Sequence, residues 1–331
     1  MNKKIKSHLS KINFILNRNP IIEKKKNWRK YIPEPYKAVV TITADFELAW
    51  AWRYSKNSPD PYKLAIEKAK RERENIPKIL DLCEKFQIPI TWATIGHLFL
   101  EKCERDKSGK AHPEIPRLNH FENEFWKYEG KDWYEYDPCS NYLDAPEWYA
   151  PDLIKMILDS KISHEIACHT FSHIDCRDEV CSPELFKAEI FECQKAASKF
   201  GVKLKSFVHP GHTIGNLDSL VPAGFLSFQT DNGNILGYPL KHKSGLWELK
   251  RSYEFSFRKE WNEKYHIYRY RKIIERAIKN HSVCNFWFHP SYDNIFQERI
   301  FPMILEYLQV NKKKVFISTV ANYLNTISKR H

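Results

Sequence analysis

The stretch "AVVTITADFE" (residues 38–47) is a run of β-branched and small apolar residues that ends in two acids. A continuous apolar run of this length predicts a strand buried on both faces, as in a parallel sheet covered by helices. Asp45 and Glu47 are two residues apart, so on an extended strand both carboxylates project to one face. A solvated strand end is the alternative, but buried carboxylates are costly without a cation. The stretch therefore predicts a strand that leads into a functional site.

Similar strands alternate with helical stretches along the chain. Further strands are expected at 88–96, 164–169, 204–211, 224–231, 246–252, 282–290 and 313–319, and helices at 61–86, 146–160, 182–201 and 262–280. Seven or so strand–helix units predict an α/β fold, a single domain over 33–331 whose parallel sheet closes into a barrel. Functional side chains of such folds gather at the C-terminal strand ends. Six candidates fall at such ends: Asp45, Glu47, His169, His209, Asp231 and His289.

Two regions lie outside this pattern. The sequence predicts a basic helix or tail over residues 1–32. Residues 1–30 hold ten lysines and arginines and one acid, Glu23, whereas the net charge of the whole chain is +12. The helix either packs an apolar stripe on the protein or lies on an anionic membrane; the stripe is Ile5, Leu9, Ile12 and Leu16. The second region, about 101–147, is an insertion rich in aromatic residues, which either stack on sugar rings or pack against the barrel or a partner subunit.

The remaining composition narrows the class of protein. Outside residues 1–30 the charges nearly balance, and no nucleic-acid-binding motif is present, so no nucleic-acid partner is expected. The eight cysteines form no C-x-x-C pair, and no apolar run of about 18 residues occurs. Together with the lack of a secretory signal pattern, this predicts a cytoplasmic protein, with membrane association through residues 1–30 as the variant.

Histidines supply the candidate metal ligands. In "HTFSH" (169–173), His169 and His173 are four positions apart, and on a helical turn they would face one side, where a metal could bind. Two solvated surface histidines are the alternative. In "FWFHP" (286–290), His289 ends a strand among aromatic residues, a position that also suits a structural histidine.

In this order, the motifs resemble those of the metal-dependent polysaccharide deacetylases, carbohydrate esterase family 4. "TADFE" resembles its first motif, "HTFSH" within "SHEIACHTFSH" its second, "SFVHPGHTIGNLDSLVPAGF" its third, and "FWFHP" its last. The resemblance spans about residues 36–325, apart from 101–147, and implies a distorted (β/α) barrel with seven or so strands.

The resemblance also implies roles for individual residues. Glu47, His169 and His173 would bind a divalent metal, most often zinc, while Asp45 would act as general base and His289 as general acid. Asp45 and Glu47 could exchange roles. The family's third motif carries an Arg that pairs with the catalytic Asp, but Val208 stands at that position here. Residues expected to tune the base or bind substrate instead are His209, Pro210, His212, Asp231 and Trp287.

The expected function is removal of an N-acetyl or O-acetyl group from a sugar in surface-polysaccharide or glycolipid metabolism. The missing Arg leaves a second hypothesis open, that the chain is a weakly active or inactive carbohydrate-binding relative. A third is an amidohydrolase of small non-sugar amides.

Overall fold

A curled sheet of mainly parallel strands forms the centre of the molecule. The computed structural model describes residues 3–16, 18–231 and 233–329. Neighbouring strands follow the order β10 (Leu240–Lys241), β11 (Trp247–Lys250), β8 (Ser227–Thr230), β7 (Ser206–Val208), β6 (Glu165–Cys168), β3 (Thr91–Thr94), β2 (Ala38–Phe46), β13 (Val283–Phe288) and β12 (Tyr253–Glu254). Only β10 runs antiparallel in this sheet, while β14 (Val315–Ile317) pairs with the first residues of β2. The predicted α/β class with a parallel sheet is confirmed.

One segment joins the two ends of the sheet. Strand β11 pairs with β8, and β12, which starts three residues after β11 ends, pairs with β13. The pairing changes between two adjacent residues, since the amide of Arg251 donates to Thr230 and that of Ser252 donates to Asn285. Residues 247–254 thus act as a single strand with two partners. They complete a ring of seven strand positions, which is the distorted barrel that the sequence predicts.

Polar side chains fill the centre of this ring. Gln229 on β8 accepts hydrogen bonds from Asn285 on β13 and from Arg251 after β11, at 3.1 and 3.2 Å, and exchanges a further one with Thr43 on β2. These residues are buried. Because buried polar groups need partners, this network fixes how the three strands face one another. It also lies directly beneath the strand ends that carry the candidate site.

Helices cover the outside of the barrel. They are α2 (Pro61–Phe86), α3 (Pro151–Leu158), α4 (Pro183–Ser198), α5 (Glu263–Asn280), α6 (Phe301–Val310) and α7 (Val320–Ser328). Their starts follow the sequence: the side chains of Asp60, Ser182 and Asn262 each accept a hydrogen bond from the first turn of α2, α4 and α5. None of the described helices is both long and apolar enough to span a bilayer.

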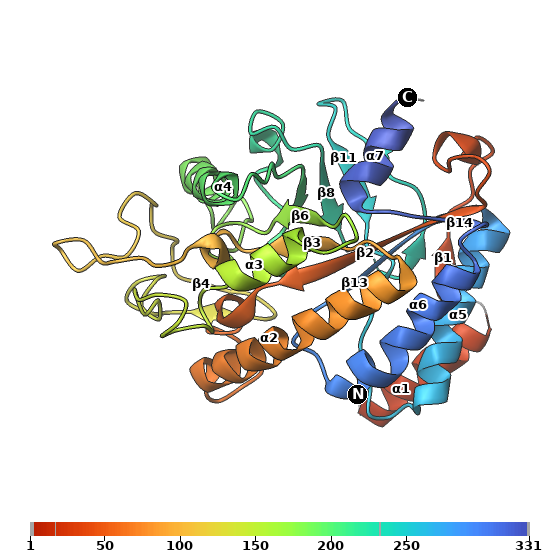
Figure 1. Cartoon of the computed structure of the whole chain (residues 1–331), viewed down its shortest axis with the longest axis horizontal. Helices are drawn as coiled ribbons and strands as arrows, with labels where there is room; N and C mark the ends of the chain where they lie inside the picture. The colour runs from red at the N-terminus through yellow and green to blue at the C-terminus, as the bar shows by residue number, and fades with distance from the viewer. Residues whose placement is uncertain (1–2, 17, 232, 330–331) are drawn as a thin grey trace.

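The N-terminal helix α1 (Lys3–Ile15) lies beside α5, away from the insertion loops (Figure 1). It packs through Phe14, which is buried beneath the guanidinium groups of Arg269 and Arg276. The predicted apolar stripe faces outward instead: Ile5, Leu9, Ile12 and Leu16 are all exposed. Of the two alternatives for this stripe, packing on the barrel is therefore wrong.

The insertion forms loops at one end of the barrel, with two short strand pieces, β4 (Phe121–Glu122) and β5 (Lys127–Tyr128) (Figure 1). Most of its aromatic residues pack inward. The buried ones include Trp126, Tyr128, Trp133 and Tyr134, whereas Phe125 is exposed. Packing against the barrel thus accounts for most of the aromatic density, and Phe125 and Trp126 alone of this group also line the central pocket.

Candidate metal and catalytic site

Three predicted metal ligands meet at the end of β2. Oε1 of Glu47 lies 3.0 Å from Nε2 of His169 and 3.1 Å from Nε2 of His173. All three side chains are buried. Ligand atoms around one zinc ion, bound at 2.0–2.2 Å, are separated by about 3.3 Å, so the observed spacing is close to that of three ligands of one ion. The structure thus brings together the three residues that the sequence singled out.

The hydrogen bonds of these ligands suit a cation. Nδ1 of His169 donates to the carbonyl oxygen of Val208 at 2.7 Å, so in the neutral ring Nε2 presents a lone pair to Glu47. Two electron-rich atoms then face each other at 3.0 Å, an arrangement that a cation between them stabilises. The other carboxylate oxygen of Glu47 is buried without a hydrogen-bond partner among the described residues. The residues present therefore fit a divalent metal.

Charge at the site favours the same conclusion. Burial lowers the pKa of His173 to about 4, so the ring is neutral at neutral pH. Burial alone would raise the pKa of Glu47, but the adjacent histidines, above all His289, outweigh burial and hold the pKa of Glu47 well below its usual range. A carboxylate and an uncharged imidazole are the forms in which these side chains bind metals.

A turn with left-handed backbone angles, and not a helix, orients the two histidines. Thr170 and His173 both have left-handed backbone angles, with φ of 61°, which is unfavourable for residues other than glycine. Oγ1 of Thr170 compensates by accepting a hydrogen bond from the amide of His173 at 3.0 Å. Glu189 on α4 holds the same turn, because its carboxylate accepts from the amides of Phe171 and Ser172, both at 2.8 Å. The two histidines therefore do not share a helical turn, although both rings still reach the same point.

The predicted base has a cation partner that the sequence analysis missed. Nη2 of Arg251 lies 2.7 Å from Oδ1 and 3.0 Å from Oδ2 of Asp45, and both side chains are buried. Arg251 also stacks on Trp287, with its guanidinium carbon 4.6 Å from the ring centre. It follows β11, at the same kind of strand end that identified the other candidates. The strand-end rule applied to "LWELKRS" could therefore have found it.

His289 points into the site and is oriented from behind. Its Nε2 lies 3.4 Å from Oε2 of Glu47 and 4.0 Å from Oδ2 of Asp45. Its Nδ1 lies 2.7 Å from the hydroxyl of Tyr292, which itself donates to Glu254. Because that hydroxyl proton is used, Tyr292 accepts from Nδ1–H of His289 and leaves Nε2 free for chemistry. Nothing in the spacing of Glu254 and Tyr292 marked them in the sequence.

The residues predicted to replace the missing Arg differ in whether they can act on Asp45. His209 turns Nε2 to the carbonyl oxygen of Gly215, and burial lowers the pKa of His209 to about 3, so it offers no charge to Asp45. Asp231 is exposed and lies 3.7 Å from His212. Assigning the Arg role to His209 or Asp231 is therefore wrong, since Arg251 occupies that position. His212 and Trp287 do line the pocket around Asp45. Pro210 is not among the lining residues, although the next residue, Gly211, is.

The pocket wall combines the third motif with the insertion. The ring of Trp126 packs edge-on against His173, with centroids 4.8 Å apart. Gly211, with φ of 53°, makes room for this indole, because a Cβ there would lie 2.4 Å from the Trp126 ring. Phe125 and Trp52 form further apolar parts of the pocket wall. An open pocket of apolar walls beside a polar centre suits a ligand with both kinds of surface.

A family profile described as "Polysaccharide deacetylase" matches residues 57–217 of the chain, which include His169, His173 and the third motif. The match confirms the predicted resemblance to the polysaccharide deacetylase family over these residues, which are slightly less than half of the chain. Asp45, Glu47, Arg251 and His289 lie outside the matched residues, so their place in the site comes from the structure. No curated protein matches the chain in sequence.

Solved structures of polysaccharide deacetylases share this fold. The chain resembles a putative polysaccharide deacetylase from Mycobacterium smegmatis, at 13% identity and a TM-score of 0.59, over 90% of this chain and 93% of that one. A probable polysaccharide deacetylase from Pseudomonas aeruginosa PAO1 gives 9% identity and a TM-score of 0.62, over 91% and 94%. The PuuE allantoinase is 11% identical with a TM-score of 0.60, and the match covers 91% of this chain and 94% of the allantoinase. At these identities the likeness establishes the fold alone.

Proposed function

We propose that this polysaccharide deacetylase family member is a metal-dependent hydrolase that removes an N-acetyl, or an O-acetyl, group from a sugar or glycan. The observation that carries the proposal is the meeting of two sets of side chains in one pocket. Glu47, His169 and His173 form a metal-ligand set, and Asp45 and His289 lie beside it. Together they offer the ligands, the base and the acid that hydrolysis of an amide requires.

A divalent ion, which we propose to be zinc, would be held by Glu47, His169 and His173 and would supply Lewis-acid polarisation of the acetyl carbonyl and activation of water. Arg251 holds the carboxylate of Asp45 in place at the pocket floor, where it can accept the proton of the attacking water. His289, held through Nδ1 by Tyr292, can donate a proton from Nε2 to the departing sugar nitrogen. An amide nitrogen needs that proton, because an unprotonated amide anion is a very poor leaving group.

Arg251 also bears on the alternative of an inactive relative. That hypothesis rested on the missing Arg of the third motif, and here an Arg from another strand end reaches the same carboxylate. The amidohydrolase alternative makes use of the same metal ligands and differs in substrate. Both alternatives become outcomes of one experiment.

The experiment is an acetate-release screen of the metal-loaded protein over nucleotide-linked, lipid-linked and oligomeric acetylated sugars. We expect acetate from at least one class, and none from the Asp45→Asn variant at equal metal content. Turnover of a small ureide or formamide with none on sugars would replace the proposal by the amidohydrolase. Binding of sugar and metal without turnover would replace it by the inactive relative.

A cytoplasmic location with peripheral membrane contact is part of the proposal, and it would suit a lipid-linked substrate. Support comes from α1, whose exposed Ile5, Leu9 and Ile12 lie on a segment rich in lysine. We expect the protein to sediment with vesicles of anionic lipid and less with neutral ones. An Ile5→Ser/Leu9→Ser/Ile12→Ser variant should stay in solution, and equal sedimentation of this variant would exclude α1 as the contact.

A further inference from the structure

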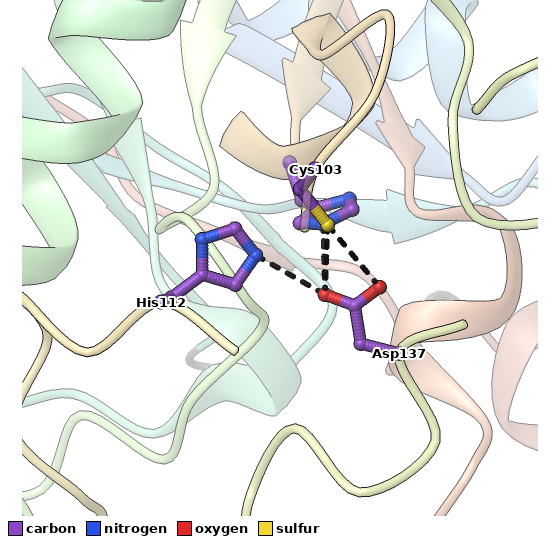
Figure 2. A group of neighbouring side chains, drawn as sticks. Cys103, His112 and Asp137 are labelled. Carbon is purple, nitrogen blue, oxygen red and sulfur yellow. Dashed lines mark hydrogen bonds and ion pairs between the residues drawn. The ribbon is translucent and has the colours of Figure 1, made fainter. Parts of the chain in front are cut away.

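A second group of metal-ligating side chains lies in the insertion, separate from the catalytic pocket. It comprises His97, which follows β3, and Cys103, His112 and Asp137 of the insertion; we call these four residues the insertion cluster. His97, His112 and Asp137 are buried and Cys103 is half-buried. Figure 2 shows the thiol of Cys103 and the ring of His112 both directed at the carboxylate of Asp137.

The distances within the insertion cluster match a tetrahedral site. Oδ2 of Asp137 lies 3.1 Å from Nε2 of His97, 3.1 Å from Nε2 of His112 and 3.5 Å from Sγ of Cys103. Sγ of Cys103 lies 3.7 Å from Nε2 of His97. Around one zinc ion, with bonds of about 2.0–2.1 Å to nitrogen and oxygen and about 2.3 Å to sulfur, tetrahedral ligands are separated by about 3.3–3.6 Å. These four of the six distances among the ligand atoms are thus close to those of one such tetrahedron, and the other two are within 4.8 Å.

The surroundings orient the ligand atoms as an outer shell of a metal site does. Nδ1 of His97 lies 3.1 Å from the carbonyl oxygen of Trp148, an acceptor, so Nδ1 carries the proton and the neutral ring turns the lone pair of Nε2 inward. The other oxygen of Asp137 accepts from the amide of Cys139 at 2.9 Å and the hydroxyl of Tyr149 at 3.2 Å. Oδ2 is thereby left to face His97, His112 and Cys103 alone.

We infer that the insertion cluster binds a second divalent ion, of the zinc type, in a closed four-ligand structural site. Imidazole, thiolate and carboxylate are all ligands that zinc takes in proteins, and a complete protein ligand set leaves no position for substrate. The competing arrangement is an ion pair in which a protonated His97 donates to Asp137. Only the metal site requires the sulfur of Cys103 to be a ligand, so the sulfur distinguishes the two.

Such an ion would fix the wall of the catalytic pocket. Between Cys103 and Trp148 the chain has little regular secondary structure. A metal ion bound by residues at both ends of such a long segment would keep it ordered. The ion would tie both ends of the insertion to the end of β3. The amides of Gly96 and His97 in turn donate to the carbonyl oxygens of Thr170 and Phe171, in the turn that carries the catalytic histidines, at 2.8 and 2.9 Å.

Cobalt substitution tests this inference, because the catalytic ligands are nitrogen and oxygen, and the insertion cluster adds a thiolate. The full-length protein is stripped with chelator and reloaded with Co²⁺ alone. We expect the near-ultraviolet absorption of a cobalt–thiolate bond, and two bound ions per chain. A His169→Ala/His173→Ala variant should keep that absorption with one ion per chain. Folded wild-type protein that binds cobalt without this absorption would overturn the inference.

Cysteine variants locate the sulfur. Cys103→Ser should lose the cobalt–thiolate absorption and one of the two ions per chain. The matched control is Cys139→Ser, at a neighbouring half-buried cysteine, which should keep the absorption and both ions. Loss in Cys139→Ser with retention in Cys103→Ser would refute the ligand set. If Cys103→Ser does not fold, X-ray absorption of the zinc-loaded His169→Ala/His173→Ala variant decides the matter. A zinc–sulfur distance of about 2.3 Å supports the site, and only nitrogen and oxygen neighbours contradict it.

Discussion

Arg251 and Asp45 form a buried ion pair, in which Nη2 contacts both carboxylate oxygens at 2.7 and 3.0 Å. They come from segments 206 residues apart and meet because residues 247–254 bridge the two ends of the sheet. The same bridge carries Glu254 to the back of His289, by way of Tyr292. One irregular strand thus supplies partners for both the proposed base and the proposed acid.

Arg251→Met removes the cation from this pair. Because Asp45 then loses the hydrogen bonds that hold its carboxylate in place, we expect kcat/KM at neutral pH to fall roughly 100-fold or more. Arg251→Lys, which keeps a positive charge, should retain more activity. An unchanged kcat/KM in Arg251→Met would mean that Arg251 serves only the packing of the barrel.

Variants of the two carboxylates separate their roles. Asp45→Asn should keep the bound metal and lose roughly 10²–10⁴-fold in rate, the usual effect of a general base, whereas Glu47→Gln should lose the metal of the catalytic site. Metal content by elemental analysis, measured beside the rate, checks both. Loss of metal from Asp45→Asn with retention in Glu47→Gln would reverse the two assignments.

Glu189 positions the metal-binding turn without touching the metal. Glu189→Ala leaves the buried amides of Phe171 and Ser172 without acceptors, so we expect a loss of about 3 kcal/mol or more in the free energy of unfolding and roughly 10–100-fold weaker metal binding. The control is Glu192→Ala, on the same helix, where Glu192 pairs with the exposed Lys195. Similar denaturation midpoints and metal affinities for the two variants would show that Glu189 does not hold the turn.

His164, remote from the pocket, should make stability depend on pH. Its Nδ1 accepts from the amide of Ile90, and burial lowers the pKa of His164 to about 4. Between the unfolded value near 6.5 and this value, only the unfolded chain binds the proton, so this contribution is complete above pH 6.5 and falls as pH drops towards 4, by up to about 3 kcal/mol.

His164→Asn tests that dependence, because the amide oxygen can still accept from Ile90 and the side chain does not titrate. Urea unfolding from pH 7.5 to 5 should show a shallower loss of stability in the variant than in the wild type. Equal slopes would assign the acid sensitivity to other groups.

Sequence patterns predicted the strands, most helices and the residues of the metal set because these depend on local information. Apolar runs mark strands, and polar residues placed directly after them mark the active end of the sheet. Glu47 and His169 were recognisable in this way, and His173 from its spacing to His169; the structure places the three together.

Other features depended on three-dimensional pairing. Arg251 reaches Asp45 only because the strand that precedes it closes the ring, and no local pattern records which edge a strand joins. The outward stripe of α1 was missed for a related reason: Phe14 packs inward under Arg269 and Arg276, contacts between segments more than 250 residues apart. The insertion cluster likewise follows no standard ligand spacing, since His97 and Asp137 are 40 residues apart.

Anomalous X-ray scattering from crystals grown with zinc tests the central claim most directly. The claim is that Glu47, His169 and His173 bind one divalent ion at the end of β2. We predict an anomalous peak within about 2.0–2.2 Å of Oε1 of Glu47 and of Nε2 of both histidines. Fully ordered side chains with no peak among them, at zinc concentrations that load other sites, would contradict the account.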